Sequence, residues 1–121
     1  MLSILLVDDD REFLYTTHEL LVVRGFDVHT AASVPEALKL MEDNPADVVV
    51  ADIIIPEHDG FELIMRLKKT HPQTRIIAMS GGGKIEKETY LNMAQGIRAD
   101  TTIAKPFRIE ELVKTINSLF E

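Results

Sequence analysis

Side chains that could together bind a metal ion and a phosphoryl group occur at four separate points of this sequence. Asp8 and Asp9 follow an aliphatic run near the start of the chain, and Asp52 follows a second run. Ser80 and Lys105 follow two later apolar runs. Carboxylate oxygens suit Mg²⁺, a hard cation that keeps several waters and often shares a phosphate oxygen. The pattern therefore indicates a cation site beside a phosphoryl site.

Each of these residues has a candidate role. Lys105 and the Ser80 hydroxyl could hold phosphoryl oxygens, and Asp52 is the candidate nucleophile because carboxylates form covalent aspartyl phosphates. A metal would offset the repulsion between adjacent aspartates, which is ~1 kcal/mol at ~4 Å in water and several times larger near a protein surface. Taken alone, each residue has a commoner structural use. Asp10, the third acid of the run, is interpreted as a turn former or helix cap.

The candidate residues can meet only if the runs before them are strands of one sheet. Continuous apolar runs, rather than alternating ones, are typical of parallel strands that are covered on both faces. The second strand ends near Thr30, Ala31 and Ala32, which offer little chemistry. The predicted strands are residues 4–7, 26–30, 48–51, 76–79 and a short one within 100–104.

Helical patterns lie between the predicted strands. Ser33 with Glu36 has the pattern of a capping box, and Gly25 is placed to end the first helix. Asp59 can cap a third helix that must end before Pro72. The predicted helices are residues 11–24 with Leu14, Thr17, Leu20 and Leu21 facing inward; a helix after Ser33 with Val34, Ala37, Leu38 and Met41 at helical spacing; residues 60–70; residues 84–97; and a C-terminal helix with the stripe Ile109, Leu112, Val113, Ile116 and Phe120.

This alternation predicts one α/β domain over residues 1–121, built from five βα units. Strands that alternate with helices imply a parallel sheet with right-handed crossovers and helices on both faces. Ligands of such sheets bind outside the carboxyl ends of the strands, near the point where the strand order reverses. Residues just after the strands are therefore the place to expect chemistry.

Composition narrows the function classes. The net charge of −7 argues against direct nucleic-acid binding, which needs a basic face. The sequence has no cysteine, so it forms no disulfide and no thiolate zinc site. No apolar run approaches the roughly 20 residues that cross a bilayer, and no basic signal segment precedes the first strand. We therefore expect a cytoplasmic protein without a membrane partner.

Four segments, in order and at the matching spacing, resemble the receiver domains of two-component response regulators. They are ILLVDDD, ADIIIPEHDG, IIAMSGGG and IAKPF. The segments with DxxxPxxDG and KPF are weak signals individually, but the four together are specific, and the resemblance covers essentially the whole chain. It implies a flavodoxin-like (βα)₅ fold, a doubly wound sheet with strand order 2-1-3-4-5. In that order the second strand lies at the edge, which agrees with its chemically empty end.

The resemblance also implies roles for individual residues. Asp52 would accept a phosphoryl group from a phosphohistidine on a sensor histidine kinase or a histidine phosphotransfer protein. Asp9 and Asp52 would bind Mg²⁺ directly, together with the backbone carbonyl of Ile54, and Asp8 would act mainly through water. Ser80 would hydrogen-bond the phosphoryl group and Lys105 would pair with it. Such a protein is a phosphoacceptor that promotes its own phosphorylation and dephosphorylation, and it is not a turnover enzyme.

Further expectations follow from the same resemblance. The peptide before Pro106 should be cis, and kinases should dock on the first helix and on the loop after the fifth strand, with Phe13 partly exposed there. Phe13 as a plain core residue is the alternative. Thr102 stands where the family often has an aromatic switch residue, and three glycines, 81–83, follow Ser80. Since the chain ends with the fifth helix, a stand-alone receiver with an unknown downstream protein is expected.

Three other functions remain as alternatives. A haloacid-dehalogenase-type phosphatase would use Asp8 and Asp10 as its D-x-D pair, but it needs a hydroxyl residue where this chain has Glu12. A flavin-binding module would need a Ser-, Thr- and Gly-rich loop after the first strand, where three aspartates would repel the phosphate. A pseudo-receiver would commonly lack an acid or the lysine, and here none is lost. Incubation with a small phosphodonor and Mg²⁺ distinguishes these functions: a receiver gains one acyl phosphate, a phosphatase turns the donor over repeatedly, and a pseudo-receiver does not react.

Overall fold

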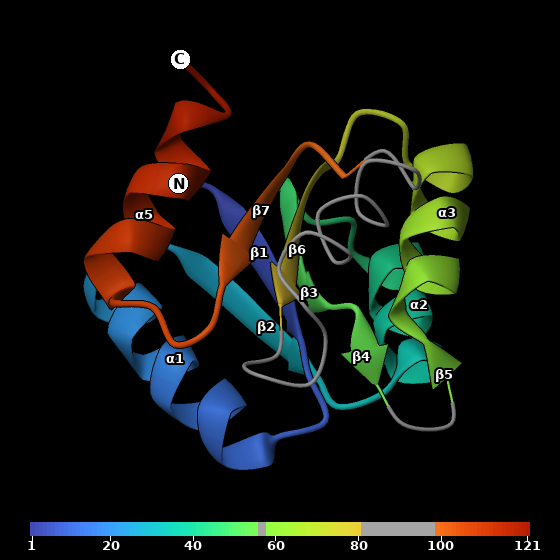
Figure 1. Ribbon diagram of the computed structural model, residues 1–121. Helices are drawn as coiled ribbons and strands as arrows, with labels where there is room; N and C mark the ends of the chain where they lie inside the picture. The colour runs from blue at the N-terminus through green and yellow to red at the C-terminus, as the bar shows by residue number, and fades with distance from the viewer. Residues whose placement is uncertain (56–57, 81–98) are drawn as a thin grey trace.

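In the computed structural model, residues 1–55, 58–80 and 99–121 are described, apart from the side chains of residues 54, 55, 58, 59, 61 and 80. The centre of the fold is a five-stranded parallel sheet with the strand order β2-β1-β3-β6-β7 (Figure 1). The predicted flavodoxin-like order 2-1-3-4-5 is therefore confirmed. The strands are β1 (Ser3–Val7), β2 (Asp27–Ala31), β3 (Val48–Asp52), β6 (Arg75–Ser80) and β7 (Thr101–Ala104).

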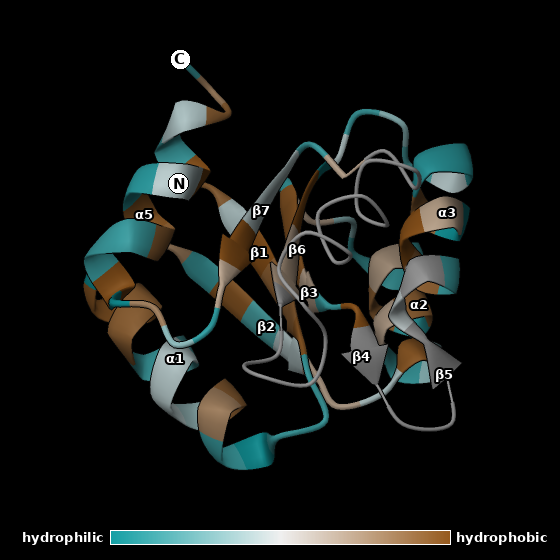
Figure 2. Ribbon diagram, viewed as in Figure 1, coloured by the Kyte–Doolittle hydropathy of each residue, from teal (hydrophilic) through white to brown (hydrophobic). Residues whose placement is uncertain are grey.

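Helices cover both faces of this sheet, which explains why the middle residues of its central strands are apolar (Figure 2). Helices α1 (Arg11–Val23) and α5 (Ile109–Ser118) pack on one face. Helices α2 (Val34–Asp43) and α3 (Gly60–Thr70) pack on the other. Alternate residues of β1 enter the two cores: Ile4 and Leu6 contact the α1 and α5 side, and Leu5 and Val7 contact the α2 and α3 side. Each fully buried aliphatic side chain contributes about 1.5–3 kcal/mol to folding.

Polar side chains begin the first two helices as expected. The Asp10 carboxylate accepts a hydrogen bond from the Phe13 N–H at the start of α1. Ser33 Oγ accepts from the Glu36 N–H at the start of α2, but Glu36 in return accepts from the Ala32 N–H rather than from Ser33. Gly25, with φ of +92°, ends α1 in the left-handed region that favours glycine.

Two side chains that we predicted to face inward are exposed. Leu20 of α1 is 41% exposed, and Phe120, which lies beyond the end of α5, is 44% exposed. Leu20 lies one position from Leu21, so the helix turns it about 100° away from the buried stripe. The other inward positions of α1, Leu14, Thr17 and Leu21, are buried as predicted.

One local feature was not predicted. β4 (Ile54–Ile55) and β5 (His58–Asp59) form a two-stranded antiparallel pair between β3 and α3. α3 then begins at Gly60, in close contact with the end of β3: a Cβ added at Gly60 would lie 2.5 Å from the Asp52 carbonyl oxygen. The predicted helix 84–97, the glycines 81–83 and the Asp59 side chain lie outside the described residues.

Candidate functional site

The register of the sheet brings the predicted residues to one rim. Val7, the last residue of β1, pairs with Ala51, and Asp52 pairs with Met79. Ser80 pairs with Ala104, the residue before Lys105. Asp8, Asp52, Ser80 and Lys105 therefore all stand at the carboxyl ends of neighbouring strands, where doubly wound sheets bind their ligands.

Three carboxylates gather at this rim. Asp8, Asp9 and Asp52 each offer an oxygen, and these oxygens lie within 4.8 Å of one another. Asp8 and Asp52 are buried, whereas Asp9 is exposed. Two buried oxygens and one that reaches solvent form a hard, open donor set, as Mg²⁺ requires when it keeps part of its water shell. The residues present thus fit this ion.

Lys105 supplies a positive charge to two of the carboxylates. Its ammonium donates hydrogen bonds to Asp8 Oδ2 and to Asp52 Oδ2, the latter at 3.2 Å. Burial by itself would lower the pKa of Lys105, but the hydrogen bond to Asp8 and the charges of Asp52 and Asp8 outweigh burial and raise that pKa. Burial also raises the pKa of the Asp8 carboxyl, against the opposing effects of Lys105 and of the Asp10 N–H. A charged lysine thus stands at the centre of the acidic site.

Asp10 has the structural use that we predicted. Its backbone N–H donates to Asp8 Oδ1 at 3.0 Å, and its side chain caps α1. The group of clustered carboxylates does not include it. Asp10 therefore links the acidic site to the start of α1.

An aromatic pair beside Lys105 was only partly foreseen. Phe13 is half-buried, and its ring centroid lies 4.3 Å from Lys105 Nζ. The ring of Phe107 meets it edge-to-face, with centroids 6.0 Å apart. The expected partial exposure of Phe13 is confirmed, and so is the cis peptide between Lys105 and Pro106. The contact of Phe13 with the lysine was not predicted.

Two adjoining hollows lie between α1 and the segment after β7. One has a volume of about 370 Å³ and is lined by Asp10, Phe13, Lys105, Pro106 and Phe107. The other, of about 360 Å³, continues along α1 past Thr16 and Leu20. We call these two hollows together the α1 groove. It opens directly beside Lys105.

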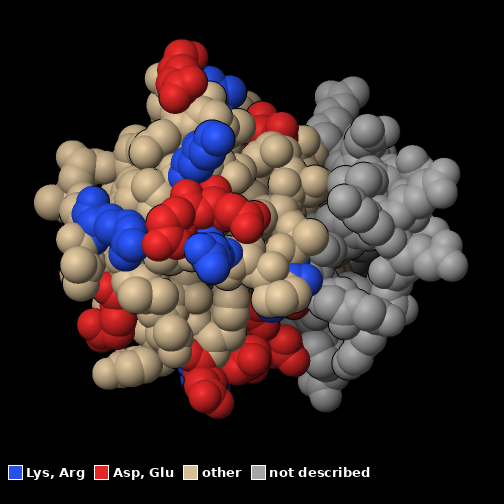
Figure 3. Space-filling model, turned by 60° about the vertical axis from the view of Figure 1, so that its left-hand side comes forward, with Lys and Arg blue, Asp and Glu red and all other residues tan. Residues whose placement is uncertain are grey.

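Acidic and basic side chains are interspersed on the side of the molecule that α1 and α5 form (Figure 3). Arg24 of α1, for example, lies 3.7 Å from Glu110 of α5. An exposed pair of this kind contributes at most about 1 kcal/mol. This side therefore carries mixed charge rather than a basic surface.

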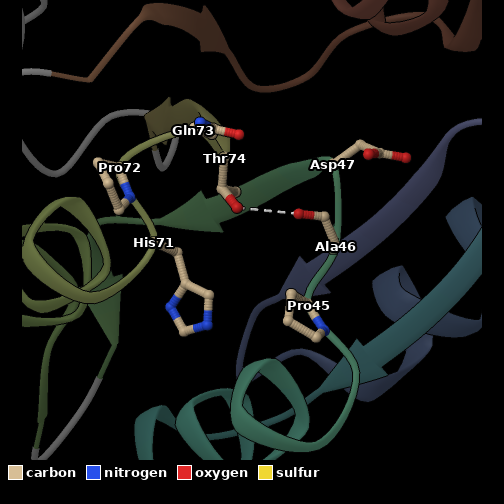
Figure 4. Close-up of a pocket in the computed structure, with 7 residues that line it drawn as sticks. All are labelled: Pro45, Ala46, Asp47, His71, Pro72, Gln73 and Thr74. Carbon is tan, nitrogen blue, oxygen red and sulfur yellow. Dashed lines mark hydrogen bonds between the residues drawn. The ribbon is translucent and has the colours of Figure 1, made fainter.

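A further cavity, of about 490 Å³, is lined by residues of the loops that precede β3 and β6 (Figure 4). It therefore lies at the amino ends of these strands, whereas the acidic site lies at the carboxyl ends. Thr74 Oγ1 donates to the Ala46 carbonyl at 2.9 Å, and the Asp47 carboxylate accepts from the backbone and hydroxyl of Ser3. The polar groups of its lining thus anchor the loops to the sheet. They do not combine several charges as the rim does.

For two of the predicted site residues, Ile54 and Ser80, the structure describes only the backbone. Ile54 lies two residues after Asp52, at the start of β4, and Ser80 ends β6. Thr102 is half-buried in β7. The roles of Ser80 as a phosphoryl ligand and of Ile54 as a metal ligand stay predictions.

The fold and the rim together define a doubly wound α/β protein with an acidic site at the carboxyl ends of its strands. The family model of the response regulator receiver domain matches residues 4–117. The chain therefore belongs to the response regulator receiver domains, which are phosphoacceptor domains of two-component signalling.

Three known proteins illustrate the relationship. The chain is 35% identical to the sensor kinase CckA of Brucella abortus, over 98% of this chain and 12% of the kinase. It is 37% identical to the transcriptional regulatory protein CpxR of Klebsiella pneumoniae, over 98% of this chain and 49% of that regulator. The response regulator TrrA of Thermotoga maritima, solved in complex with Mg²⁺-BeF, matches with a TM-score of 0.85 at 27% identity, over 98% of this chain and 99% of that one.

The chain thus spans about half the length, or less, of these two curated relatives. None of the helices in the described part of the chain combines the length and apolarity that a membrane span requires.

Proposed function

We propose that Asp52 is the phosphoacceptor of this receiver and that it takes a phosphoryl group from a phosphohistidine with the help of Mg²⁺. The observation that carries this proposal is the meeting of Asp8, Asp9, Asp52 and Lys105 at one rim of the sheet. The side chain of Asp52 is only 7% exposed, so its carboxylate is largely removed from water and interacts closely with the charge of Lys105.

The chemistry is a single displacement at phosphorus. An Asp52 carboxylate oxygen forms the new bond to phosphorus as the bond from phosphorus to the donor's imidazole nitrogen breaks, and the electron pair of that bond leaves with the imidazole. Lys105 already touches Asp52, so its ammonium stands where it can pair with a phosphoryl oxygen. The Ser80 hydroxyl would hold another oxygen.

Asp8, Asp9 and Asp52, with the Ile54 carbonyl, would hold the Mg²⁺. The ion would supply charge neutralisation for the phosphoryl oxygens and for the acids around them. The complex of TrrA with Mg²⁺-BeF supports this part of the proposal by similarity, since that chain shares the fold over 98% of the present one.

The expected donor is a sensor histidine kinase or a histidine phosphotransfer protein, and the α1 groove is the surface that would receive it. The groove is open and adjoins Lys105. After transfer, the phosphorylated form would change its binding to a downstream protein. A cytoplasmic location and the absence of direct nucleic-acid binding are part of this proposal.

Incubation with acetyl phosphate and Mg²⁺ tests the proposal. Intact-protein mass spectrometry should show one added phosphoryl group per chain, and chelation of Mg²⁺ should abolish the addition. Asp52→Asn should take up none, because an amide is a far weaker nucleophile than a carboxylate of the same shape. Asp47→Asn, which changes an aspartate away from the rim, is the control and should be phosphorylated normally.

Continuous turnover of many donor molecules without a phosphorylated protein would instead indicate a phosphatase. No uptake by the unmodified chain would indicate a pseudo-receiver. Either result would contradict the proposed function.

A further inference from the structure

Lys105 is held from two directions at the acidic rim. On one side its ammonium donates hydrogen bonds to Asp8 and Asp52. On the other side the ring of Phe13 lies 4.3 Å from Nζ, within the range of a cation–π interaction. The lysine side chain is only 18% exposed, so little water screens this contact.

The Phe13 ring is itself held in place. Its backbone N–H donates to the Asp10 carboxylate at 3.1 Å, which fixes the residue in the first turn of α1. Its ring and the ring of Phe107 pack edge-to-face, at an interplanar angle of 88°. Phe107 follows Lys105 by two residues, so the segment after β7 supplies both the ammonium and a support for the ring that faces it.

These contacts form a closed circuit around the site. Asp8 Oδ1 accepts from the Asp10 N–H, and Asp10 Oδ1 accepts from the Phe13 N–H. The Phe13 ring faces the Lys105 ammonium, which returns to Asp8 through a hydrogen bond. A shift of the ring would therefore change the position of the ammonium relative to the carboxylates.

We propose that Phe13 is a positioning residue for Lys105: the face of its ring holds the ammonium beside Asp52, where the phosphoryl group is to be bound. This inference rests on the proposed function of Asp52. Phe13 could serve in two ways, by filling apolar space or by attracting the ammonium with its ring face, and these two roles can be distinguished. A leucine fills a similar apolar space in a helix, but only an aromatic ring has the negative face that attracts a cation.

Phe13→Leu and Phe13→Tyr are the informative variants, with acetyl phosphate and Mg²⁺ as the phosphodonor so that protein docking plays no part. Loss of the ring should slow phosphorylation about three- to tenfold, the range expected for a partly desolvated cation–π contact. Tyrosine keeps the ring face and should restore most of the rate.

Phe26→Leu is the matched control for lost aromatic packing. Phe26 is also half-buried against the core on the α1 and α5 side, but it precedes β2 at the other end of the sheet. This variant should be phosphorylated at the original rate. Urea unfolding of both leucine variants measures any packing defect separately.

Non-additivity shows whether Phe13 acts through the lysine. Lys105→Met should slow phosphorylation, and Phe13→Leu added to it should slow it no further. An equal extra slowing in the Lys105→Met background would overturn the inference, and so would a normal rate for Phe13→Leu or equal effects of Phe13→Leu and Phe26→Leu.

A second measurement does not depend on phosphorylation. In ¹H–¹³C spectra the Cε protons of Lys105 should be shifted upfield by the ring face, in the original chain and in Phe13→Tyr but not in Phe13→Leu. Unshifted protons in the original chain would refute the positioning role, even if Asp52 proves to be the phosphoacceptor. If the shift is present but Asp52→Asn is phosphorylated normally, the proposed function fails while the Phe13 contact stands.

Discussion

Lys105 Nζ donates a hydrogen bond to Asp52 Oδ2 at 3.2 Å, although the two residues are 53 positions apart in the sequence. The same ammonium reaches Asp8, which is 97 positions away. These contacts exist because the sheet order sets β3 between β1 and β6, with β7 beside β6. The charge balance of the site is thus a property of the tertiary fold, and changes in the fold near the rim should alter the chemistry.

Gly60 provides a test of this dependence. A Cβ at this position would lie 2.5 Å from the Asp52 carbonyl oxygen and 2.6 Å from Ile53 Cα, both of which are backbone atoms. Gly60→Ala should therefore lower the free energy of unfolding by about 1–3 kcal/mol and slow phosphorylation of Asp52. Gly25→Ala, which is strained by a φ of +92° but meets no atom within 4 Å, should destabilise the chain without slowing phosphorylation. Normal phosphorylation of Gly60→Ala would contradict the account.

Mg²⁺ should stabilise the folded chain, since three carboxylates are clustered at the rim and Lys105 contacts only two of them, Asp8 and Asp52. A ligand at 100 times its dissociation constant stabilises by about 2.7 kcal/mol, so the thermal midpoint should rise as Mg²⁺ is added. Asp9→Asn should reduce that rise. Asp10→Asn should not, because asparagine caps helices as well as aspartate does and Asp10 is outside the cluster. Equal responses of the two variants to Mg²⁺ would exclude Asp9 as a ligand.

Leu20 tests the docking surface. It lines the α1 groove and is 41% exposed, so Leu20→Ser should change stability little. We expect slower transfer from a phosphorylated kinase or phosphotransfer protein and an unchanged rate with acetyl phosphate. If both rates fall together, the groove does not act by docking.

The lifetime of the aspartyl phosphate is predicted from the sequence alone. Hydrolysis needs a water placed in line with phosphorus. The family resemblance implies that the side chains two positions after the phosphoacceptor and two after Ser80 flank the approach of this water. The first of these is Ile54, whose side chain offers no hydrogen bond to orient the water. Gly82, two positions after Ser80, offers none either, although a glycine could also admit water more freely. Slow loss is expected, and Ile54→Asn should speed it. The measurement is a time course of phosphoryl loss from the original chain in the presence of Mg²⁺. A half-life of seconds would contradict the expected slow loss.

The elements and the rim could be predicted because they depend on local patterns. Continuous aliphatic runs predicted the strands of the sheet, and the acids or the lysine after three of them predicted which of the described side chains share a rim. The caps of α1 and α2 could also be predicted, because the side chains of Asp10 and Ser33 accept hydrogen bonds from N–H groups only three residues further along the chain.

What could not be predicted depends on tertiary geometry. The exposure of Leu20 depends on how α1 lies on the sheet, because that placement decides which of the adjacent residues Leu20 and Leu21 faces the core. The close approach of Gly60 to β3 and the contact of Phe13 with Lys105 depend on how separate elements pack against one another. The resemblance predicted that Phe13 is partly exposed at the docking surface, but it did not predict that its ring faces the lysine.

The most direct measurement locates the phosphoryl group on the chain. Borohydride reduces an acyl phosphate of aspartate to homoserine, so treatment of the protein after incubation with acetyl phosphate and Mg²⁺ marks the modified residue permanently. Peptide mass spectrometry should then find homoserine at position 52, only in the sample that received the phosphodonor. Homoserine at Asp8 or Asp9, or an unmodified Asp52 in a chain that had gained a phosphoryl group, would contradict the assignment of Asp52 as the phosphoacceptor.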